Sequence, residues 1–281
     1  MNITIIGLGL IGGSVALDLA HQLETKVYGY DNNPNHAQEA IRLGLITEII
    51  SENQIYACSD VIIIATPVDQ ITNMLPSILD KIKSTTVVID LGSTKVNITK
   101  AVANHPNRGQ FVAAHPLAGT EFSGPGAATK GLFEGKKNII CDAEHAKPEA
   151  VNLALRIFKS LGLKTIFMTS TDHDKHLAYV SHLSHISSFV LGLTVLEIEK
   201  DEKNIFNLAG SGFESTVRLA KSNPKTWSPI FDNNKDNLLE AIDNYILQLN
   251  EFRTAIKMDN LNLLEEKMYK ANAIIQILKE K

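Results

Sequence analysis

Three glycines directly after the first apolar segment place the strongest limit on how this chain can fold. Ile3–Ile6 reads as a buried strand, Gly7–Gly12 has the sequence G-L-G-L-I-G, and a helical pattern opens at Ile11. The spacing G-x-G-x-x-G is weak evidence by itself, because glycine-rich turns are common. Between a strand and a helix, however, it indicates a turn that binds a dinucleotide.

Each glycine has a distinct task in such a turn. Gly7 permits the tight turn, Gly9 lets the backbone approach a pyrophosphate, and Gly12 brings the helix against the strand. The helix N-terminus then offers N–H donors and the positive end of its dipole to the phosphates. The candidate cofactor-binding residues of this segment are Gly7, Gly9, Leu10, Ile11 and Gly12.

Asp31 predicts which dinucleotide binds. It ends a second strand, about twenty residues beyond the last glycine, where dinucleotide-binding folds place an acidic residue for the ribose. Its carboxylate accepts hydrogen bonds from ribose hydroxyls and repels a 2′-phosphate. Because Asn32–Asn35 contains no Lys or Arg to offset that repulsion, we expect NAD rather than NADP.

Residues 1–169 alternate β-branched runs with helical patterns. Several runs are apolar throughout, as expected where a parallel sheet is covered on both faces. The alternation predicts an α/β fold with a doubly wound, mainly parallel sheet of the Rossmann type. The expected strands are Ile3–Ile6, Lys26–Tyr30, Val61–Ala65, Val87–Leu91, Phe111–Ala113, Asn138–Cys141 and Thr165–Met168, and the helices between them include Asn33–Leu43, Asp69–Lys83 and Pro148–Leu161.

Residues 170–281 show helical periodicity only. One long helix is expected to begin near Ser170 and to reach about Lys200, and apolar positions spaced by three or four recur in Leu238–Ile256 and Leu261–Leu278. So much apolar surface on about 110 residues exceeds what these helices can bury alone. The sequence therefore predicts an all-α domain at 170–281 that forms a homodimer.

Composition excludes several classes of protein. The formal net charge is −4 and the basic residues are scattered, which disfavours a nucleic-acid surface. Cys58 and Cys141 provide neither a disulfide framework nor a cysteine zinc site. The first residues lack the features of a signal peptide, and no apolar stretch is expected to approach the ~20 residues that span a bilayer. We expect a cytoplasmic protein without a membrane segment.

Two loops follow the carboxyl ends of expected strands. Thr66–Val68 comes after Val61–Ala65, and Gly92–Lys95 comes after Val87–Leu91. Open α/β sheets bind ligands at this edge, so Thr66 and Pro67 are candidate cofactor residues. Ordinary helix capping is the alternative for Thr66.

His115 follows the expected strand Phe111–Ala113 on the same edge. An imidazole has an unperturbed pKa of ~6.5, so it can act as a general base near neutral pH. Oxidation of an alcohol by NAD needs such a base for the hydroxyl proton. A single histidine after a strand is more often structural, and both interpretations stay open on the residues alone.

The expected long helix carries four histidines. The pairs His173/His176 and His182/His185 each share one helical face. No H-E-x-x-H pattern or suitably spaced carboxylate accompanies them, so no metal site is expected. His173 and His176, at the helix start, are expected to be solvated or capping residues.

Arg218 and Trp227 lie between the later helical stretches. A guanidinium can hold a carboxylate with two parallel hydrogen bonds, and Trp227 follows closely enough to line the same pocket. A surface ion pair is the alternative for Arg218.

Five ordered motifs resemble the prephenate/arogenate dehydrogenase family over nearly the whole chain. After the glycine turn they are D-x-G-S-x-K at Asp90–Lys95, H-P-hydrophobic-A-G-T-E at His115–Glu121, S-H-L-x-H at Ser181–His185, G-F-x-x-x-x-R at Gly212–Arg218 and N-P-x-x-W at Asn223–Trp227. The resemblance implies NAD-dependent oxidative decarboxylation of prephenate to 4-hydroxyphenylpyruvate, a step in tyrosine biosynthesis.

The resemblance also implies roles for single residues. His115 is the base for the ring hydroxyl, Ser93 hydrogen-bonds His115 and helps to seat substrate and nicotinamide, and Arg218 binds the ring carboxylate. The other implied substrate-binding residues are His182, His185, Thr120, Glu121 and Trp227, the last from the same chain or from a partner subunit.

Alternatives remain for the substrate and for the class of protein. Prephenate is favoured over arogenate, but Glu214 stands where some relatives carry a basic residue. Glu214 either eases acceptance of the arogenate amine or faces solvent. A β-hydroxyacid dehydrogenase-like enzyme would need a catalytic Lys in the helical region, and a non-catalytic NAD-sensing protein would need neither His115 nor Arg218.

Overall fold

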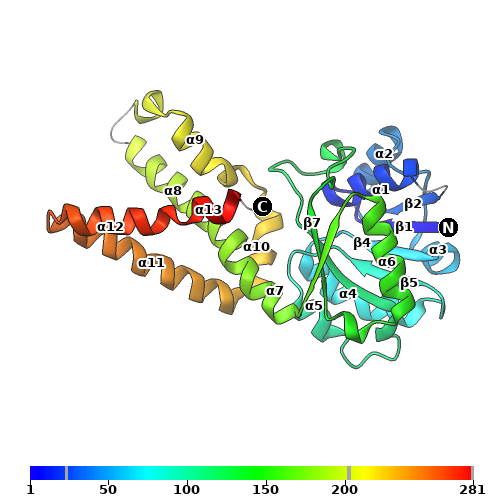
Figure 1. The fold of residues 1–281 in the computed structure, drawn as a ribbon. Helices are drawn as coiled ribbons and strands as arrows, with labels where there is room; N and C mark the ends of the chain where they lie inside the picture. Colours follow the sequence, from blue (N-terminus) through cyan, green and yellow to red (C-terminus); the bar gives the residue numbers. More distant parts are fainter. Residues whose placement is uncertain (23–24, 201–203, 280–281) are drawn as a thin grey trace. The chain divides into compact units, whose positions relative to one another are not determined.

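The computed structural model describes residues 1–22, 25–200 and 204–279 (Figure 1). The chain divides into two compact units, Met1–Lys235 and Asp236–Lys281. The first unit contains the sheet and every candidate site residue, whereas the second is helical.

The sheet of the first unit has eight strands in the order β3-β2-β1-β4-β5-β6-β7-β8. Neighbouring strands are parallel except for β6 and β7, which pair antiparallel. This confirms the predicted doubly wound, mainly parallel sheet. The strands are β1 Asn2–Ile6, β2 Lys26–Tyr30, β3 Glu48–Ile49, β4 Val61–Ile64, β5 Val87–Asp90, β6 Phe111–Pro116, β7 Lys137–Cys141 and β8 Lys164–Met168.

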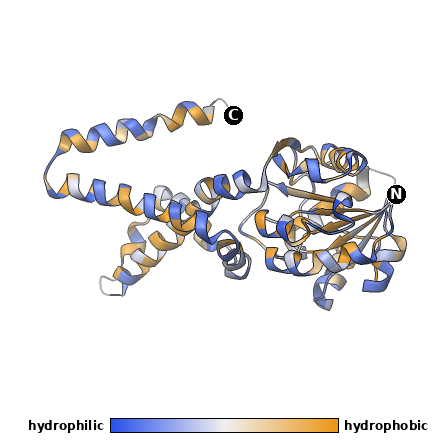
Figure 2. Cartoon of the chain, turned by 90° about the horizontal axis from the view of Figure 1, so that it is seen from below, coloured by the Kyte–Doolittle hydropathy of each residue, from blue (hydrophilic) through white to orange (hydrophobic). Residues whose placement is uncertain are grey.

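Helices cover both faces of the sheet because alternate strand residues point to opposite sides. Ile3 and Ile5 pack with α1, α2 and α6, whereas Ile62 and Ile64 pack with α3, α4 and α5. The strands are accordingly hydrophobic along their length in Figure 2. The helices are α1 Leu10–Gln22, α2 Pro34–Arg42, α3 Glu52–Cys58, α4 Val68–Lys81, α5 Val96–Ala101 and α6 Pro148–Ser160.

Two features of the sheet differ from expectation. The two-residue strand β3 was not predicted, since so short a run carries no detectable alternation. Strand β6 extends past Ala113, because His115 and Pro116 pair with Ile139 and Asn138 of the antiparallel β7. His115 therefore lies within a strand rather than after one.

The expected single helix after residue 169 is interrupted. Helix α7, Ser170–Leu177, leads into a π-helical turn at Ala178–His182, and α8 follows at Leu183–Glu199. Contrary to expectation, the run Ser170–Glu199 is long and apolar enough to cross a membrane by length and composition alone. Its polar residues nevertheless include the buried side chains of His173 and His182.

The remaining helices expose much apolar surface. The first unit continues with α9, Ser211–Val217, and α10, Pro224–Asn233. The second unit comprises most of α11, Lys235–Lys257, with α12, Leu261–Asn272, and α13, Ile274–Lys279. Large exposed apolar side chains on these helices and on α8 include Val190, Leu193, Leu196, Leu249, Ile256, Met268 and Ile275.

Candidate functional site

A cleft of about 1040 Å³ follows the carboxyl ends of the strands. Residues after β1, β2, β4 and β5 line one side of it, and the segments 118–126 and 222–227 contribute further walls. The predicted cofactor residues that line it are Gly7, Gly9, Leu10, Ile11, Asp31, Thr66 and Pro67, and the predicted catalytic or substrate residues are Ser93, Thr120, Glu121 and Trp227.

The glycine turn has the geometry that a pyrophosphate requires. Gly7 has a positive φ of 92°, and a Cβ there would lie 2.7 Å from Ala65 O. A Cβ on Gly12 would lie 1.9 Å from Gly7 O, which explains why Gly12 supports the turn from inside rather than lining the cleft. At Gly9 nothing stands within 4 Å of the same position, so the backbone is open to a ligand. Helix α1 begins next, at Leu10.

Asp31 connects the ribose side of the cleft to this turn. One carboxylate oxygen accepts a hydrogen bond from Leu8 N at 2.9 Å, and the other accepts one from Asn33 N at 2.9 Å. His36 Nδ1 stands 3.8 Å from the same carboxylate. Each carboxylate oxygen can accept more than one hydrogen bond, so both can still receive ribose hydroxyls while they hold the glycine turn.

His115 is joined to a histidine that the sequence analysis assigned to solvent. His115 Nδ1 and His173 Nε2 form a 2.8 Å hydrogen bond, and His173 Nδ1 stands 2.7 Å from Asp174 Oδ1. The prediction for His173 was wrong: α7 packs on α5 and β7, which buries the His173 side chain completely. His176, three residues further along α7, is exposed as expected.

Ser93 does not hydrogen-bond His115 in the part of the chain that the structure describes. It lines the cleft in the loop between β5 and α5, whereas the Nδ1 atom of His115 is engaged by His173. The implied Ser93–His115 contact is therefore absent from this conformation.

The surroundings of His115 keep its imidazole neutral. Burial, followed by the electrostatic influence of His173, Lys95 and His182, holds the pKa of His115 well below its usual value. Burial also lowers the pKa of His173, although its hydrogen bond with Asp174 opposes that shift. A histidine that is neutral at pH 7 is ready to accept a proton.

A buried ion pair beneath the Ser93 loop was not singled out in the sequence. Lys95 Nζ donates to Asp90 and also to Ala114 O at 2.7 Å, and both charged side chains are completely buried. Asp90 accepts in addition from Gly92 N at 2.9 Å. This ion pair ties the ends of β5 and β6 together next to His115. A charged pair five residues apart directly after an apolar strand was the available signal.

The rings of His182 and His185 contact Trp227, as expected if all three residues line one substrate pocket. The rings of His185 and Trp227 stack with centroids 3.3 Å apart, and His182 approaches Trp227 edge-on at 6.1 Å. Asn234 Nδ2 donates to His182 Nδ1 at 3.1 Å. Burial lowers the pKa of His182 to about 4 and also lowers that of His185, so both are neutral aromatic surfaces at pH 7. Trp227 lines the cleft of its own chain.

Arg218 lies at the margin of the cleft, with 54% of its side chain exposed. Its Nη1 atom stands 3.7 Å from Glu121 Oε2, and Glu121 lines the cleft next to Thr120. Glu214 points elsewhere, because its exposed carboxylate stands 3.9 Å from Lys221 Nζ. The solvent-facing alternative for Glu214 therefore describes this structure.

Metal ligation is not supported by the residues at hand. Within residues 1–22, 25–200 and 204–279, no group of three or more His, Cys, Asp or Glu side chains is placed to hold a metal ion.

Comparison with known proteins matches both halves of the chain. Residues 15–167 match the family model described as "Prephenate dehydrogenase, nucleotide-binding domain", and residues 169–270 match "Prephenate dehydrogenase, dimerization domain". The prephenate dehydrogenase of Bacillus subtilis is 31% identical over 92% of this chain and 71% of its own length. The cyclohexadienyl dehydrogenase of Zymomonas mobilis is 30% identical over 94% of this chain and 92% of its own.

A solved structure gives the same result. The prephenate dehydrogenase of Aquifex aeolicus, crystallised with hydroxyphenyl propionate and NAD+, has a TM-score of 0.86 and 29% identity. The match covers 100% of this chain and 98% of that chain. With a nucleotide-binding domain and a dimerisation domain in sequence order, this chain belongs to the prephenate dehydrogenase family.

Proposed function

We propose that this chain is an NAD-dependent prephenate dehydrogenase, which oxidises the ring alcohol of prephenate with loss of carbon dioxide. The observation that carries the proposal is the single cleft lined by the glycine turn and Asp31 together with Ser93, Glu121 and Trp227. His115, a half-buried and neutral imidazole, lies on strand β6 at the same edge of the sheet. A cofactor site, a base and an aromatic wall at one sheet edge suit hydride transfer from a ring alcohol.

The residues of the cleft fit NAD. Gly9 leaves open space for the pyrophosphate, and the N-terminus of α1 faces the same turn. Asp31 favours the free ribose hydroxyls of NAD over the phosphate of NADP. Thr66 and Pro67 would complete the cofactor site beyond the pyrophosphate.

The chemistry requires little covalent work from the protein. When bound, NAD supplies the hydride acceptor. The ring hydroxyl proton passes to His115 Nε2 as the C–H hydride leaves, which converts the ring alcohol to a ketone. The carboxylate then departs as carbon dioxide, its bonding electrons complete the aromatic ring, and the resulting phenolate oxygen takes the proton back from His115. Since aromatisation drives this last step, the chain mainly positions the reactants.

The other site residues bind substrate in this proposal. Arg218 holds the ring carboxylate, and Ser93 helps to seat the ring beside the nicotinamide. Arg218 already pairs with a carboxylate, that of Glu121, which supports an anion-binding role. The remaining contacts are assigned to His182, His185, Thr120, Glu121 and Trp227.

The wider organisation is proposed with the function. We assign residues 1–169 to cofactor binding and 170–281 to substrate binding and dimerisation, with a homodimer formed through the helical part. The exposed apolar side chains of α8 and α11 support this pairing. We further propose a cytoplasmic protein that uses neither nucleic acid nor a membrane.

Arogenate is the second candidate substrate. The Zymomonas mobilis relative is named for cyclohexadienyl substrates in general, a name that is compatible with the amine-bearing arogenate. A β-hydroxyacid dehydrogenase-like enzyme would use a catalytic Lys of the helical region, whereas the helical side chains that contact Trp227 in this chain are His182 and His185.

A side-by-side assay tests the proposal. Purified protein with NAD and prephenate, and separately with arogenate, should produce NADH absorbance and an equal amount of carbon dioxide. NADH formation from neither acid would refute the proposal and would favour an NAD-sensing role, provided that NAD still binds.

A further inference from the structure

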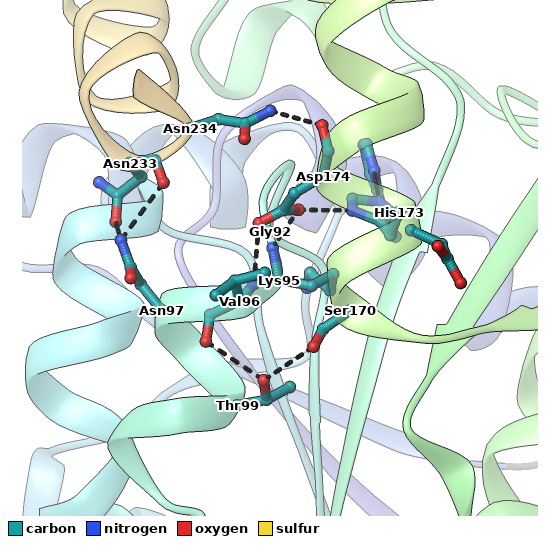
Figure 3. A network of polar contacts seen from close by, with 12 residues as sticks. Gly92, Lys95, Val96, Asn97, Thr99, Ser170, His173, Asp174, Asn233 and Asn234 are labelled. Atoms are coloured by element: carbon teal, nitrogen blue, oxygen red, sulfur yellow. Dashed lines mark hydrogen bonds and ion pairs between the residues drawn. The ribbon is translucent and has the colours of Figure 1, made fainter. Parts of the chain in front are cut away.

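His115 is the end of a buried chain of hydrogen bonds that continues to a carboxylate. His115 Nδ1 meets His173 Nε2 at 2.8 Å. His173 Nδ1 in turn meets Asp174 Oδ1 at 2.7 Å (Figure 3). His173 and Asp174 have relative exposures of 0% and 1%. Such isolation from water leaves few alternative partners, so the hydrogen-bond directions can be derived.

The directions follow from Asp174. Its oxygens accept hydrogen bonds from Lys95 N at 2.7 Å and Val96 N at 2.9 Å, as a carboxylate does. Toward His173 it is again an acceptor, so His173 Nδ1 carries a proton. A neutral His173 then has an unprotonated Nε2, which must accept from His115 Nδ1–H. His115 is left with an unprotonated Nε2, the atom that a general base uses.

His115 Nε2 is available for this use. Among the described residues, none hydrogen-bonds it, and it is not one of the enclosed side-chain atoms that lack a partner. It is therefore open to solvent or to a substrate hydroxyl.

We infer that His173 and Asp174 are positioning residues that hold His115 in the tautomer required of the base. The inference rests on the proposed function for its catalytic meaning, but the tautomer itself is a property of the free protein. When His115 gains a proton at Nε2, its Nδ1–H keeps donating to His173, and the Asp174 carboxylate stabilises the imidazolium through that ring.

Asp174 also couples the base to the cofactor side of the cleft. Asp174 accepts hydrogen bonds from the backbone N–H groups of Lys95 and Val96. These two residues begin helix α5, directly after the loop that carries Ser93. Asn234 Nδ2, at the end of α10, donates to the Asp174 carbonyl oxygen at 2.7 Å, and Asn97 Nδ2 donates to Asn233 Oδ1 at 3.1 Å, which joins α5 to α10 (Figure 3). One carboxylate thus fixes the orientation of His115 and the position of the Ser93 loop together.

Two amide substitutions of similar size separate the two hydrogen bonds of His173. In His173→Gln, the amide oxygen can replace Nε2 and accept from His115 Nδ1–H. In His173→Asn, the shorter amide can replace Nδ1 and donate to Asp174 but cannot reach His115. We expect His173→Asn to lower kcat by ~10- to 100-fold, below the ~10²–10⁴-fold that a general base contributes. His173→Gln should retain most of the activity.

Matched controls lie on the same helix. His176→Gln changes an exposed histidine of α7, and Asp172→Asn changes an exposed aspartate near Asp174. Both should leave kcat unchanged. Equal activities of His173→Gln and His173→Asn would overturn the inference.

A pH profile distinguishes positioning from a loss of stability. The charged groups that face the two rings are Lys95, Asp174 and Asp90, and the further titratable group is the imidazole of His182. Because Asp174 favours the imidazolium, Asp174→Asn should move the acidic limb of kcat/KM to lower pH and also reduce the plateau. A variant that is only less stable would reduce the plateau and leave the limb in place, which would contradict the inference.

A spectroscopic measurement needs no substrate. In ¹⁵N NMR spectra of the imidazole side chains, wild-type His115 should show a protonated Nδ1 and an unprotonated Nε2 at pH 7. Protonation of Nε2 instead would refute the inference even for an active enzyme. If the protein oxidises neither acid, the proposed function fails, while this spectrum still decides the tautomer.

Discussion

The glycine turn, Gly7–Gly12, and the imidazole cluster, His115 with His173 and Asp174, lie at the same edge of the sheet but are built differently. The turn uses consecutive backbone groups between β1 and α1. The cluster takes side chains from β6 and α7, and its carboxylate holds the start of α5, across sequence separations of 58 and 79 residues. The turn excludes Cβ atoms, whereas the cluster requires particular nitrogen and oxygen atoms.

The difference decides how each region tolerates change. In the turn, the glycine positions leave no room for a Cβ or keep the backbone open to a ligand, so an added methyl group matters more than a changed functional group. In the cluster, a side chain of equal size but different hydrogen-bonding pattern is expected to remove function while the fold survives. Four measurements examine this contrast.

The largest effect is expected at the base itself. His115→Asn removes the proton acceptor and should lower kcat by ~10²-fold or more, the usual contribution of a general base, while substrate still binds. Steady-state kinetics with NAD and prephenate measure this. His145→Asn, at a histidine whose side chain is 64% exposed, is the matched control. Near wild-type turnover of His115→Asn would show that the assigned base is wrong.

Two glycine substitutions should have different consequences. Gly12→Ala places a Cβ 1.9 Å from a backbone oxygen and should cost about 1–3 kcal/mol of unfolding free energy even without cofactor. Gly9→Ala meets open space, so the free protein should keep its stability to within ~0.5 kcal/mol. It should still raise the Kd for NAD by ~10-fold, which corresponds to about 1.4 kcal/mol.

Thermal unfolding and NAD titration of both alanine variants check this pair. Equal losses of stability in the two variants would contradict the assignment of Gly12 to packing and of Gly9 to phosphate binding.

Arg218→Gln should act on binding rather than on chemistry. The ring carboxylate is charged in both the ground state and the transition state, so KM should rise by ~10-fold while kcat changes little. Lys221→Gln is the control, because Lys221 is an exposed cation in the same short helical segment, with its own ion pair to Glu214. A fall in kcat without a change in KM would place Arg218 in the chemical step instead.

The smallest effect is a displacement of the pH profile. Only the unprotonated form of His115 is active, and burial lowers its pKa. Activity should therefore persist as the pH falls through ~6.5, the usual imidazole value, and should decline only below it. The measurement is kcat/KM of the wild type against pH. A midpoint at or above the usual value would contradict the neutral environment described for this histidine.

The same contrast explains what the sequence could predict. Strand–helix alternation, the glycine turn and Asp31 are local patterns, and the structure has them where they were expected. The two-residue β3 and the extension of β6 to Pro116 depend on pairing with distant strands, so no local pattern reveals them.

The imidazole cluster shows the limit more clearly. At the start of a helix, His173 resembles a capping or solvated residue, and only the packing of α7 on α5 and β7 buries it. The sequence likewise does not reveal the Lys95–Asp90 ion pair, because only the tertiary structure shows that both charged side chains are buried. Motif resemblance supplied His115, Ser93 and Arg218 as candidates, whereas the contacts of His115 with His173 and of Arg218 with Glu121 are known only from the tertiary structure.

The π-helical turn at Ala178–His182 decides which changes of chain length this helix can accept. Its Leu183 N–H donates to Ala178 O, so this turn holds one residue more than an ordinary α-helical turn. Because the turn widens to absorb this extra residue, the helices on either side keep the phase that they would have in an uninterrupted α-helix one residue shorter, with His173 on His115 and His185 on Trp227. Loss of one residue within this turn should therefore leave both contacts in phase, whereas loss of one residue from the regular helical turns between His173 and His185 would rotate His185 by about 100° relative to His173.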